Sequence, residues 1–336
     1  MDDLKFGTRN KRGDWAPNEP ANVAPVFTFP PKPLKFLKWL PSYFAPYNLF
    51  FFATALIYWF YLLPDFSTMK SLEFGWMFYL YAVNALGILL FFGAVELKLY
   101  VFRTQGNRFK YNGNFPSDSK SDVFWFKSQN ADNAIRTFFI SIPIWTLTES
   151  VVMYVYANDY VPWVSFSENP AYVIALVLAV PVIHEAHFFC IHWLIHQEPL
   201  YKWVHKIHHN SINPTPWSSM SMHPVEGSAY FATAWYHLLI PSHPLIALYQ
   251  LHHAGFGAIP GHIGFEKIEF GKSHSLDSHA YIHYLHHKHF DVNYGDGLIP
   301  LDRWFGTFHD GSKEGEERML ERFKKKKARM AAKQQS

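Results

Sequence analysis

The chain has 336 residues, of which 49% are hydrophobic, 19% aromatic and only 17% charged. A soluble domain usually carries about 25% charged residues, so the composition argues against an ordinary soluble protein and for lipid contact. The formal net charge of +3 is weak evidence for any partner, and no nucleic-acid partner is expected. The single cysteine, Cys190, excludes an intrachain disulfide.

Residues 1–43 are predicted to form a polar N-terminal arm. Prolines recur between Pro17 and Pro33, and proline disfavours regular structure because it fixes φ and lacks an N–H. The arm is also basic, with Lys5, Arg9, Lys11, Arg12, Lys32, Lys35 and Lys38. We therefore expect an irregular arm on the cytosolic side of a membrane.

Four apolar segments follow, at residues 44–63, 74–95, 137–156 and 172–191. Each is close to the ~20 residues that a helix needs to cross a bilayer, and together they predict a bundle over residues 44–191. The third segment is the weakest, because it carries Thr146, Glu149 and Ser150.

Charge predicts how this bundle is oriented. The loops 64–73 and 158–170 contain one basic residue, Lys70, whereas the arm and the loop between the second and third segments are rich in Lys and Arg. The positive-inside rule then places the arm, that long loop and everything after Ile191 in the cytosol. The expected location is the endoplasmic reticulum of a eukaryote or the inner membrane of a bacterium.

Residues 192–310 are expected to form a cytosolic catalytic cap. Within them, residues 229–240 and 245–259 are apolar but too short to span. They predict a helical hairpin that dips into the cytosolic leaflet or covers the site, and an ordinary buried hairpin is the alternative. Residues 311–336 form a basic tail, which is either solvated or in contact with anionic lipid.

Three histidine boxes lie in the second half of the chain: His192-Trp-Leu-Ile-His196, His205-Lys-Ile-His208-His209 and His283-Tyr-Leu-His286-His287. Residues four apart share a helix face, so the first box can bind one metal. In the other two boxes we expect the first and second histidines to share a face and the third to reach a neighbouring metal. Imidazole suits iron, zinc and copper, and eight histidines exceed the four ligands that zinc usually takes. The boxes therefore predict two ions, and solvated or structural histidines are the alternative.

These boxes resemble those of the fatty acid hydroxylase/sterol desaturase superfamily over about residues 171–310. The resemblance also rests on three further stretches: Asn213-Pro-Thr-Pro-Trp217, His223-Pro-Val-Glu-Gly227, and Asn293-Tyr-Gly295 with Asp302-Arg-Trp-Phe-Gly-Thr307. These elements are most similar to those of sterol-type members. The resemblance implies an all-α integral membrane fold, with four transmembrane helices below a cytosolic helical cap that holds two iron ions through histidines.

Carried over by position, the resemblance implies nine metal ligands: His192, His196, His205, His208, His209, His253, His283, His286 and His287. His253 is included because it precedes an x-Gly step, as a further family histidine does. Glu185 lies nearly two helical turns before His192 and is expected to orient a ligand imidazole, although a polar residue inside the bundle is the alternative. Trp193 stands where the first box of the family often has Arg.

The other histidines are assigned weaker roles. His223, His262 and His279 are candidates for indirect support or for a variable ligand. His184 and His187 are expected to face away from His192, as packing or pore-facing residues. The remainder are expected to be structural: His237, His243, His274, His289 and His309.

The predicted function is an O2-dependent hydroxylase or desaturase of a lipid, either a sterol or a long-chain acyl or sphingoid lipid. A methylene C–H bond is inert to acids and bases, so a redox metal must activate O2. Two electrons per turnover imply a separate donor, of the cytochrome b5 or ferredoxin type. Zinc is expected only as a replacement for iron during overexpression.

Two alternatives remain open. A membrane zinc hydrolase lacks support because no His-Glu-x-x-His motif occurs, and His184-Glu-Ala-His187 has the wrong spacing. A metal transporter would need ionisable groups deep in several spans, whereas the boxes lie outside them.

Overall fold

The computed structural model describes residues 1–271 and 273–335, so Ser336 of the predicted tail lies outside the described residues. The fold is mainly helical, and four stretches are long and apolar enough to cross a membrane. They are Pro33–Leu62, Phe74–Val101, Gln129–Ala157 and Pro170–Ile195. Three of the predicted segments fall within these stretches and the first overlaps its stretch except for residue 63, so the prediction of a multi-pass membrane protein is confirmed.

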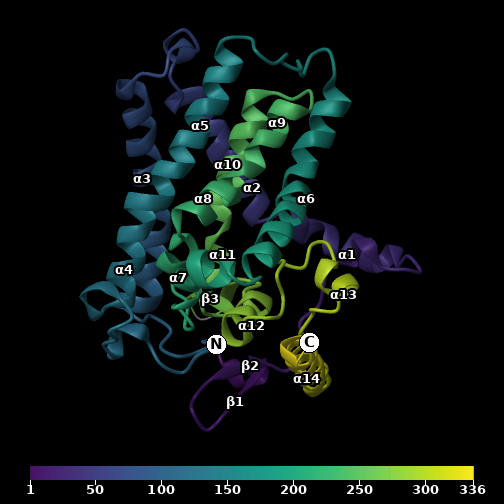
Figure 1. Cartoon of the computed structure of the whole chain (residues 1–336). Helices are drawn as coiled ribbons and strands as arrows, with labels where there is room; N and C mark the ends of the chain where they lie inside the picture. Colours follow the sequence, from purple (N-terminus) through teal and green to yellow (C-terminus); the bar gives the residue numbers. More distant parts are fainter. Residues whose placement is uncertain (272, 336) are drawn as a thin grey trace.

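The bundle is built from α2 (Tyr47–Ile57), α3 (Phe74–Glu96), α5 (Ile142–Ala157) and α6 (Pro170–Ile195), with α4 (Gln129–Arg136) continuing into α5. The preceding helix, α1 (Pro33–Phe44), projects sideways from the bundle (Figure 1). It exposes Leu34 and Leu37 beside Lys35 and Lys38. Such a helix suits the boundary between lipid and water, where apolar and cationic side chains are both solvated favourably.

The segment predicted as a short hairpin penetrates the whole bundle. It comprises α8 (Pro224–Phe231), α9 (Tyr236–Leu239) and α10 (Pro244–Gly257), and α10 packs against α2, α5 and α6 (Figure 1). At its tip, the Val164 amide donates to the Ser242 carbonyl (2.9 Å) and the Tyr172 hydroxyl donates to the Pro241 carbonyl (2.7 Å). Because Val164 and Tyr172 flank the far end of α6, the expectation of a hairpin confined to the cytosolic leaflet is wrong.

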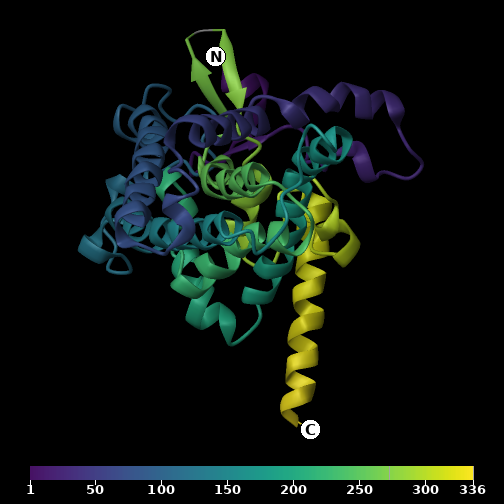
Figure 2. The ribbon, with the colours of Figure 1, turned by 90° about the horizontal axis from the view of Figure 1, so that it is seen from above.

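The cap gathers at the other end of the bundle, where both termini also lie (Figure 1). It contains α7 (Lys206–His209), α11 (Ile259–His262), α12 (Tyr281–His289) and α13 (Leu301–Phe305), with a two-stranded antiparallel sheet of β3 (Lys267–Phe270) and β4 (His274–Asp277). The last helix, α14 (Lys313–Gln335), extends away from the cap (Figure 2). The strands were not predicted from the sequence.

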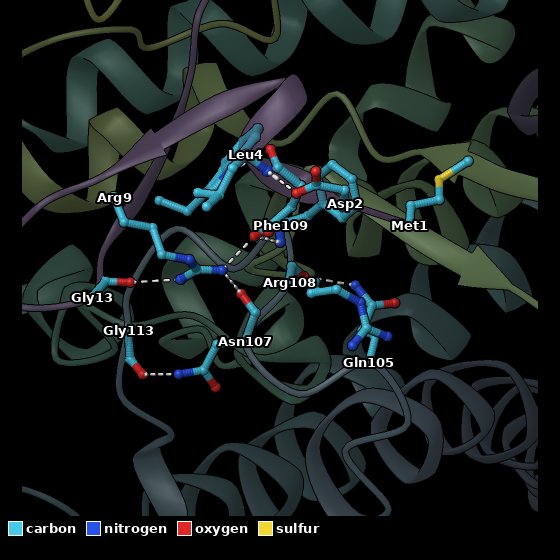
Figure 3. A network of polar contacts seen from close by, with 12 residues as sticks. Met1, Asp2, Leu4, Arg9, Gly13, Gln105, Asn107, Arg108, Phe109 and Gly113 are labelled. Carbon is cyan, nitrogen blue, oxygen red and sulfur yellow. Dashed lines mark hydrogen bonds and ion pairs between the residues drawn. The ribbon is translucent and has the colours of Figure 1, made fainter. Parts of the chain in front are cut away.

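The N-terminal arm is more ordered than its prolines predict. Strands β1 (Gly7–Arg9) and β2 (Trp15–Pro17) form an antiparallel hairpin whose Trp15 is buried against Phe109 and Tyr111. Arg9 joins the arm to the loop after α3, since its guanidinium donates to the carbonyls of Gly13 (2.8 Å) and Asn107 (2.6 Å) (Figure 3). The prediction of an irregular arm is therefore wrong here, because the hairpin precedes the proline-rich stretch and its Trp15 packs on the cap.

The same long loop also fixes the backbone that follows the second histidine box. The Lys110 ammonium donates to Asn213 Oδ1 (3.0 Å), and Gln129 donates to the Asn213 carbonyl (2.8 Å). The Tyr100 hydroxyl donates to the Pro214 carbonyl (2.9 Å). The Asn-Pro-Thr-Pro stretch thus connects the second box to the ends of the second and third spans.

Candidate metal centre

Five imidazoles converge at the base of the bundle through their Nε2 atoms. The first group comprises His192, His196, His205, His209 and His286, and all five are buried. Their Nε2 atoms lie 3.1 Å apart for His192 and His205, 3.1 Å for His196 and His209, and 3.0 Å for His209 and His286. The ligand atoms of the whole group lie within 4.8 Å of one another.

A second group of four lies beside the first. It comprises His208, His262, His283 and His287, again buried and convergent. The Nε2 atom of His262 lies 3.2 Å from that of His208 and 3.1 Å from those of His283 and His287. The two groups are neighbours, because the ring centroids of His209 and His287 are 4.9 Å apart.

The boxes are divided between the groups differently from the expectation. In the second box, His205 and His209 belong to the first group and His208 to the second. In the third box, His283 and His287 share the second group while His286 turns to the first. The physical reason is the helical angle: residues four apart differ by about 40°, whereas residues three apart differ by about 60° in the opposite sense.

The donor sets fit two metal ions. Two nitrogens 3.1 Å apart, each about 2.1 Å from a shared ion, would subtend roughly 95° there, and five donors exceed a closed tetrahedral set. Mutual hydrogen bonding is no substitute, because a neutral imidazole has one N–H. Burial lowers the pKa of His208 to about 4 and that of His286 to about 3, so both rings are neutral at pH 7, the form that binds metal.

In several of the rings the opposite nitrogen, Nδ1, is held by an acceptor that leaves Nε2 free, whereas among the described residues no partner is found for Nδ1 of His208, His209, His283 and His287. The Nδ1–H groups of His192 and His286 donate to the carbonyls of Tyr294 (2.7 Å) and Val292 (2.6 Å). The Nδ1–H of His205 donates to Glu226 Oε1 (2.8 Å). Partners of this kind fix the tautomer and orientation of a metal-binding imidazole. The Glu226 contact gives a physical role to the His-Pro-Val-Glu-Gly stretch that the sequence did not reveal.

Glu185 acts on this arrangement through the loop 292–297. Its carboxylate accepts the backbone N–H groups of Asp296 (3.1 Å) and Gly297 (3.0 Å), two residues after the carbonyl that holds His192. Asp302 holds the same loop by accepting the amides of Tyr294 and Gly295 at 2.9 and 2.8 Å. The structure therefore places Glu185 as a support of the loop and not beside an imidazole.

Glycine at 295 is required by this close approach. A Cβ at this position would lie 2.8 Å from Glu185 Oε1, which is below van der Waals contact. The Asn-Tyr-Gly stretch therefore lets a carboxylate from the bundle reach the backbone of the cap.

Two histidines lie elsewhere than expected. His253, predicted as a ligand, is in neither group, and its ring packs 4.8 Å from that of His184. His262 is in the second group instead. It belongs to no box, and it follows Gly261, where a Cβ would lie 3.2 Å from the His283 ring. The sequence predicted His262 only as a candidate for indirect support or for a variable ligand.

A cavity extends from both groups into the bundle. Its wall includes His192, His205, His208 and His283 at the metal end, with Phe51, Phe188, Tyr230 and Ile282 among its apolar residues. His184 also lines it and is in neither donor group, so it is a pore-facing residue as predicted, although it shares this cavity with His192 and does not face away from it. His187 instead packs on the hairpin, with Nε2 2.8 Å from the Ala229 carbonyl.

A four-span bundle with two adjacent groups of convergent histidines defines a multi-pass membrane protein with a candidate di-metal centre. Residues 177–307 match the family described as Fatty acid hydroxylase. Over this stretch the chain is similar to the Fatty acid hydroxylase family, and it shows distant homology to Delta(7)-sterol 5(6)-desaturases.

The relatives are distant in sequence. The chain is 33% identical over 128 residues to the Delta(7)-sterol 5(6)-desaturase ERG3A of Gibberella zeae, which covers 36% of this chain and 34% of that protein. It is 26% identical over 254 residues to the Delta(7)-sterol 5(6)-desaturase erg3C of Aspergillus fumigatus, covering 67% and 72%. For the first relatives the matches span between a third and a half of their length (34%, 39% and 49%). No solved structure matches the chain significantly.

Proposed function

We propose that this protein is a membrane-bound di-iron oxidoreductase that uses O2 to hydroxylate or desaturate a lipid. The observation that carries the proposal is the pair of buried donor groups, five and four Nε2 atoms, at one end of a cavity that enters a membrane bundle. Iron is chosen because the all-imidazole donors suit it and because the family acts with O2.

The bound metal pair would supply the redox chemistry with O2 that no side chain can provide. The chain supplies the rest. The Nε2 atoms hold the ions, while Glu226 and the carbonyls of Tyr294 and Val292 fix three of the rings. Phe188 lies against the His192 ring at 4.7 Å, so an apolar wall borders the metal end of the cavity and excludes water from a substrate carbon.

We infer that the substrate is a sterol or a long-chain acyl or sphingoid lipid. The apolar wall of the cavity suits such a molecule, and the relatives are named as sterol desaturases. Addition of one oxygen atom would raise the substrate mass by 16 units, whereas desaturation would lower it by two. Either reaction consumes two external electrons, which we assign to a separate cytochrome b5 or ferredoxin-type donor.

The donor is proposed to dock on the cytosolic face, close to the first group. His196 lines a surface groove together with Tyr201, Phe290 and Lys327, so a ligand imidazole lies directly beneath this surface. Helix α14 adds a run of exposed lysines, Lys324–Lys327. The positive-inside distribution of Lys and Arg supports the cytosolic assignment of this end.

Two measurements test the proposal. Metal analysis of the purified protein should give two iron ions per chain, and zinc alone after expression in iron-supplemented medium would contradict it. Lipid profiling of a host with and without the gene should show a lipid shifted by plus 16 or minus two mass units. The shift should vanish with His286→Ala and His283→Ala, which each disrupt one group, and persist with His274→Ala on the exposed β4 strand. An unshifted lipid profile in a host with a matched electron donor would contradict the oxygenase assignment.

A further inference from the structure

A pair of histidines in the cavity is not used by the metal centre. The rings of His184 on α6 and His253 on α10 pack 4.8 Å apart, and both line the cavity. His184 is 5% exposed. Among the described residues, neither ring finds a hydrogen-bond partner for its buried Nδ1 atom. A buried polar group without a partner costs free energy, so such a pair calls for a ligand.

The pair is separate from both donor groups but opens on the same cavity. His184 precedes His192 by eight residues, which is about 12 Å of helix rise. Phe188 lies between them, with its ring 6.1 Å from His184 and 4.7 Å from His192. A molecule lying along this face of α6 would therefore contact the pair at one end and the metal centre at the other.

The surroundings of the pair favour an uncharged ligand group. None of the described residues that line this cavity is Lys or Arg, and the acidic residues Glu226 and Asp296 are among them. The pair also borders an adjoining, more open cavity, where Lys35 and Lys267 are accompanied by Glu185 and Glu266. In the first cavity a carboxylate or phosphate would thus be buried without a cationic partner, which is costly. A hydroxyl can donate one hydrogen bond and accept another, and two neutral imidazoles offer the matching acceptor and donor.

We propose that His184 and His253 form a hydrogen-bonding site for the uncharged hydroxyl group of a lipid alcohol, and so select the substrate. The inference deepens the proposed function and rests on it. It favours a sterol or another neutral lipid alcohol over a free fatty acid. The two imidazoles are positioning residues, because they hold the substrate away from the reacting carbon.

Equilibrium binding in detergent micelles tests the site with matched probe pairs. Radiolabelled cholesterol is compared with cholest-5-ene, which lacks only the hydroxyl, and hexadecanol is compared with hexadecane. Palmitate serves as the anionic probe. We expect one alcohol to bind about tenfold more tightly than its deoxy partner, the effect of one or two neutral hydrogen bonds. The cholesterol and hexadecanol arms show whether a ring or a chain alcohol is preferred.

Substitutions then locate the discrimination. The double variant His184→Phe/His253→Phe keeps aromatic volume but removes all four ring nitrogens, and should bind the alcohol and its deoxy partner equally. The single variant His253→Gln leaves His184 unchanged and retains a donor and an acceptor at position 253. It should therefore keep part of the preference for the alcohol that the double variant loses. His274→Phe, on the surface, should behave as wild type. Because unpartnered buried nitrogens are removed, the thermal midpoint of the lipid-free double variant should be equal or higher, with unchanged metal content.

Three results would overturn the proposal. They are equal binding of alcohol and deoxy probes by the wild type, tighter binding of palmitate than of either alcohol, and a preference for the alcohol that survives in the double variant. If the two histidines had only a structural role, the double variant would bind all probes more weakly and would have a lower thermal midpoint. Metal content is read separately, so failure of the di-iron assignment would leave the binding result interpretable.

Discussion

Replacing Glu226 by alanine should weaken metal binding although every histidine of the two groups is kept. The carboxylate accepts the Nδ1–H of His205 at 2.8 Å, and both side chains are buried. Glu226→Ala leaves that donor without a partner, which costs about 1–3 kcal/mol. Loss of such a supporting contact typically lowers metal affinity about 10–100-fold, equivalent to roughly 1.4–2.7 kcal/mol, so the two magnitudes agree. Glu226→Gln keeps an oxygen acceptor for His205, so its metal affinity should fall only a few-fold.

The assay is a chelator titration of metal-loaded protein, with the retained metal measured by mass spectrometry. The chelator concentration at half release should fall at least tenfold for Glu226→Ala. Glu198→Ala, at an exposed position of the cap, is the matched control and should follow the wild type. The reasoning fails if Glu226→Ala retains metal as the wild type does, or if Glu226→Gln loses as much as Glu226→Ala.

Three further predictions follow from other contacts. Glu185→Ala frees the amides of Asp296 and Gly297, so metal should again leave at lower chelator concentration, with Glu185→Gln intermediate; unchanged release would refute the loop mechanism. Burial lowers the pKa of Lys110 to about 7 from 10.5, so the unfolded chain binds more protons between these values and stability should rise with pH. Measured by urea titration, the free energy of unfolding of the wild type should rise between pH 7 and pH 9 by about 2 kcal/mol more than that of Lys110→Met. A flat difference would mean that the rings of Tyr100, Phe115 and Phe265, 5.1–5.5 Å from Nζ, keep it charged. Reversing the exposed charges at Lys324, Lys325 and Lys327 should slow reduction by an acidic cytochrome b5 at low salt and have little effect at high salt; equal rates at low salt would remove α14 from the docking surface.

The spans and the box histidines were accessible to sequence reasoning because each leaves a local signal. A run of about 20 apolar residues predicts a crossing helix, and histidines three or four apart on a helix predict convergence. The structure places all eight box histidines in the two groups. Their division between the groups depends on small differences in helical angle, which the sequence argument assigned incorrectly.

The ninth histidine and the supports of the rings leave no such signal. His262 reaches the second group because α11 turns it toward α12, and a lone histidine after a glycine has no period to detect. The acceptors of Nδ1 include main-chain carbonyls at Tyr294 and Val292, and a carbonyl is the same in every residue. Only the fold of the loop decides which carbonyls face an imidazole.

The hairpin escaped prediction for a different reason. Hydropathy tests whether one helix is long enough to cross lipid, and neither arm of the hairpin is. At the tip of the hairpin, however, two carbonyls of the broken backbone find protein donors, since the Pro241 carbonyl accepts the Tyr172 hydroxyl and the Ser242 carbonyl accepts the Val164 amide. Irregular backbone is tolerated at depth when protein covers it, so length alone cannot exclude penetration.

Metal binding and folding of the cap are coupled in this arrangement. The first group takes its rings from the C-terminal end of α6 and the residue after it, from residues 205–209 and from α12. Their supports come from α8 and the loop 292–297, which is itself held by Glu185 of α6. No short segment contains a complete set of donors and supports, so a preformed site requires the bundle and the cap together. Ions bound by these groups therefore stabilise the contact between bundle and cap. Weakening a distant support should release metal before it unfolds the spans, because the spans are stabilised by their own apolar packing.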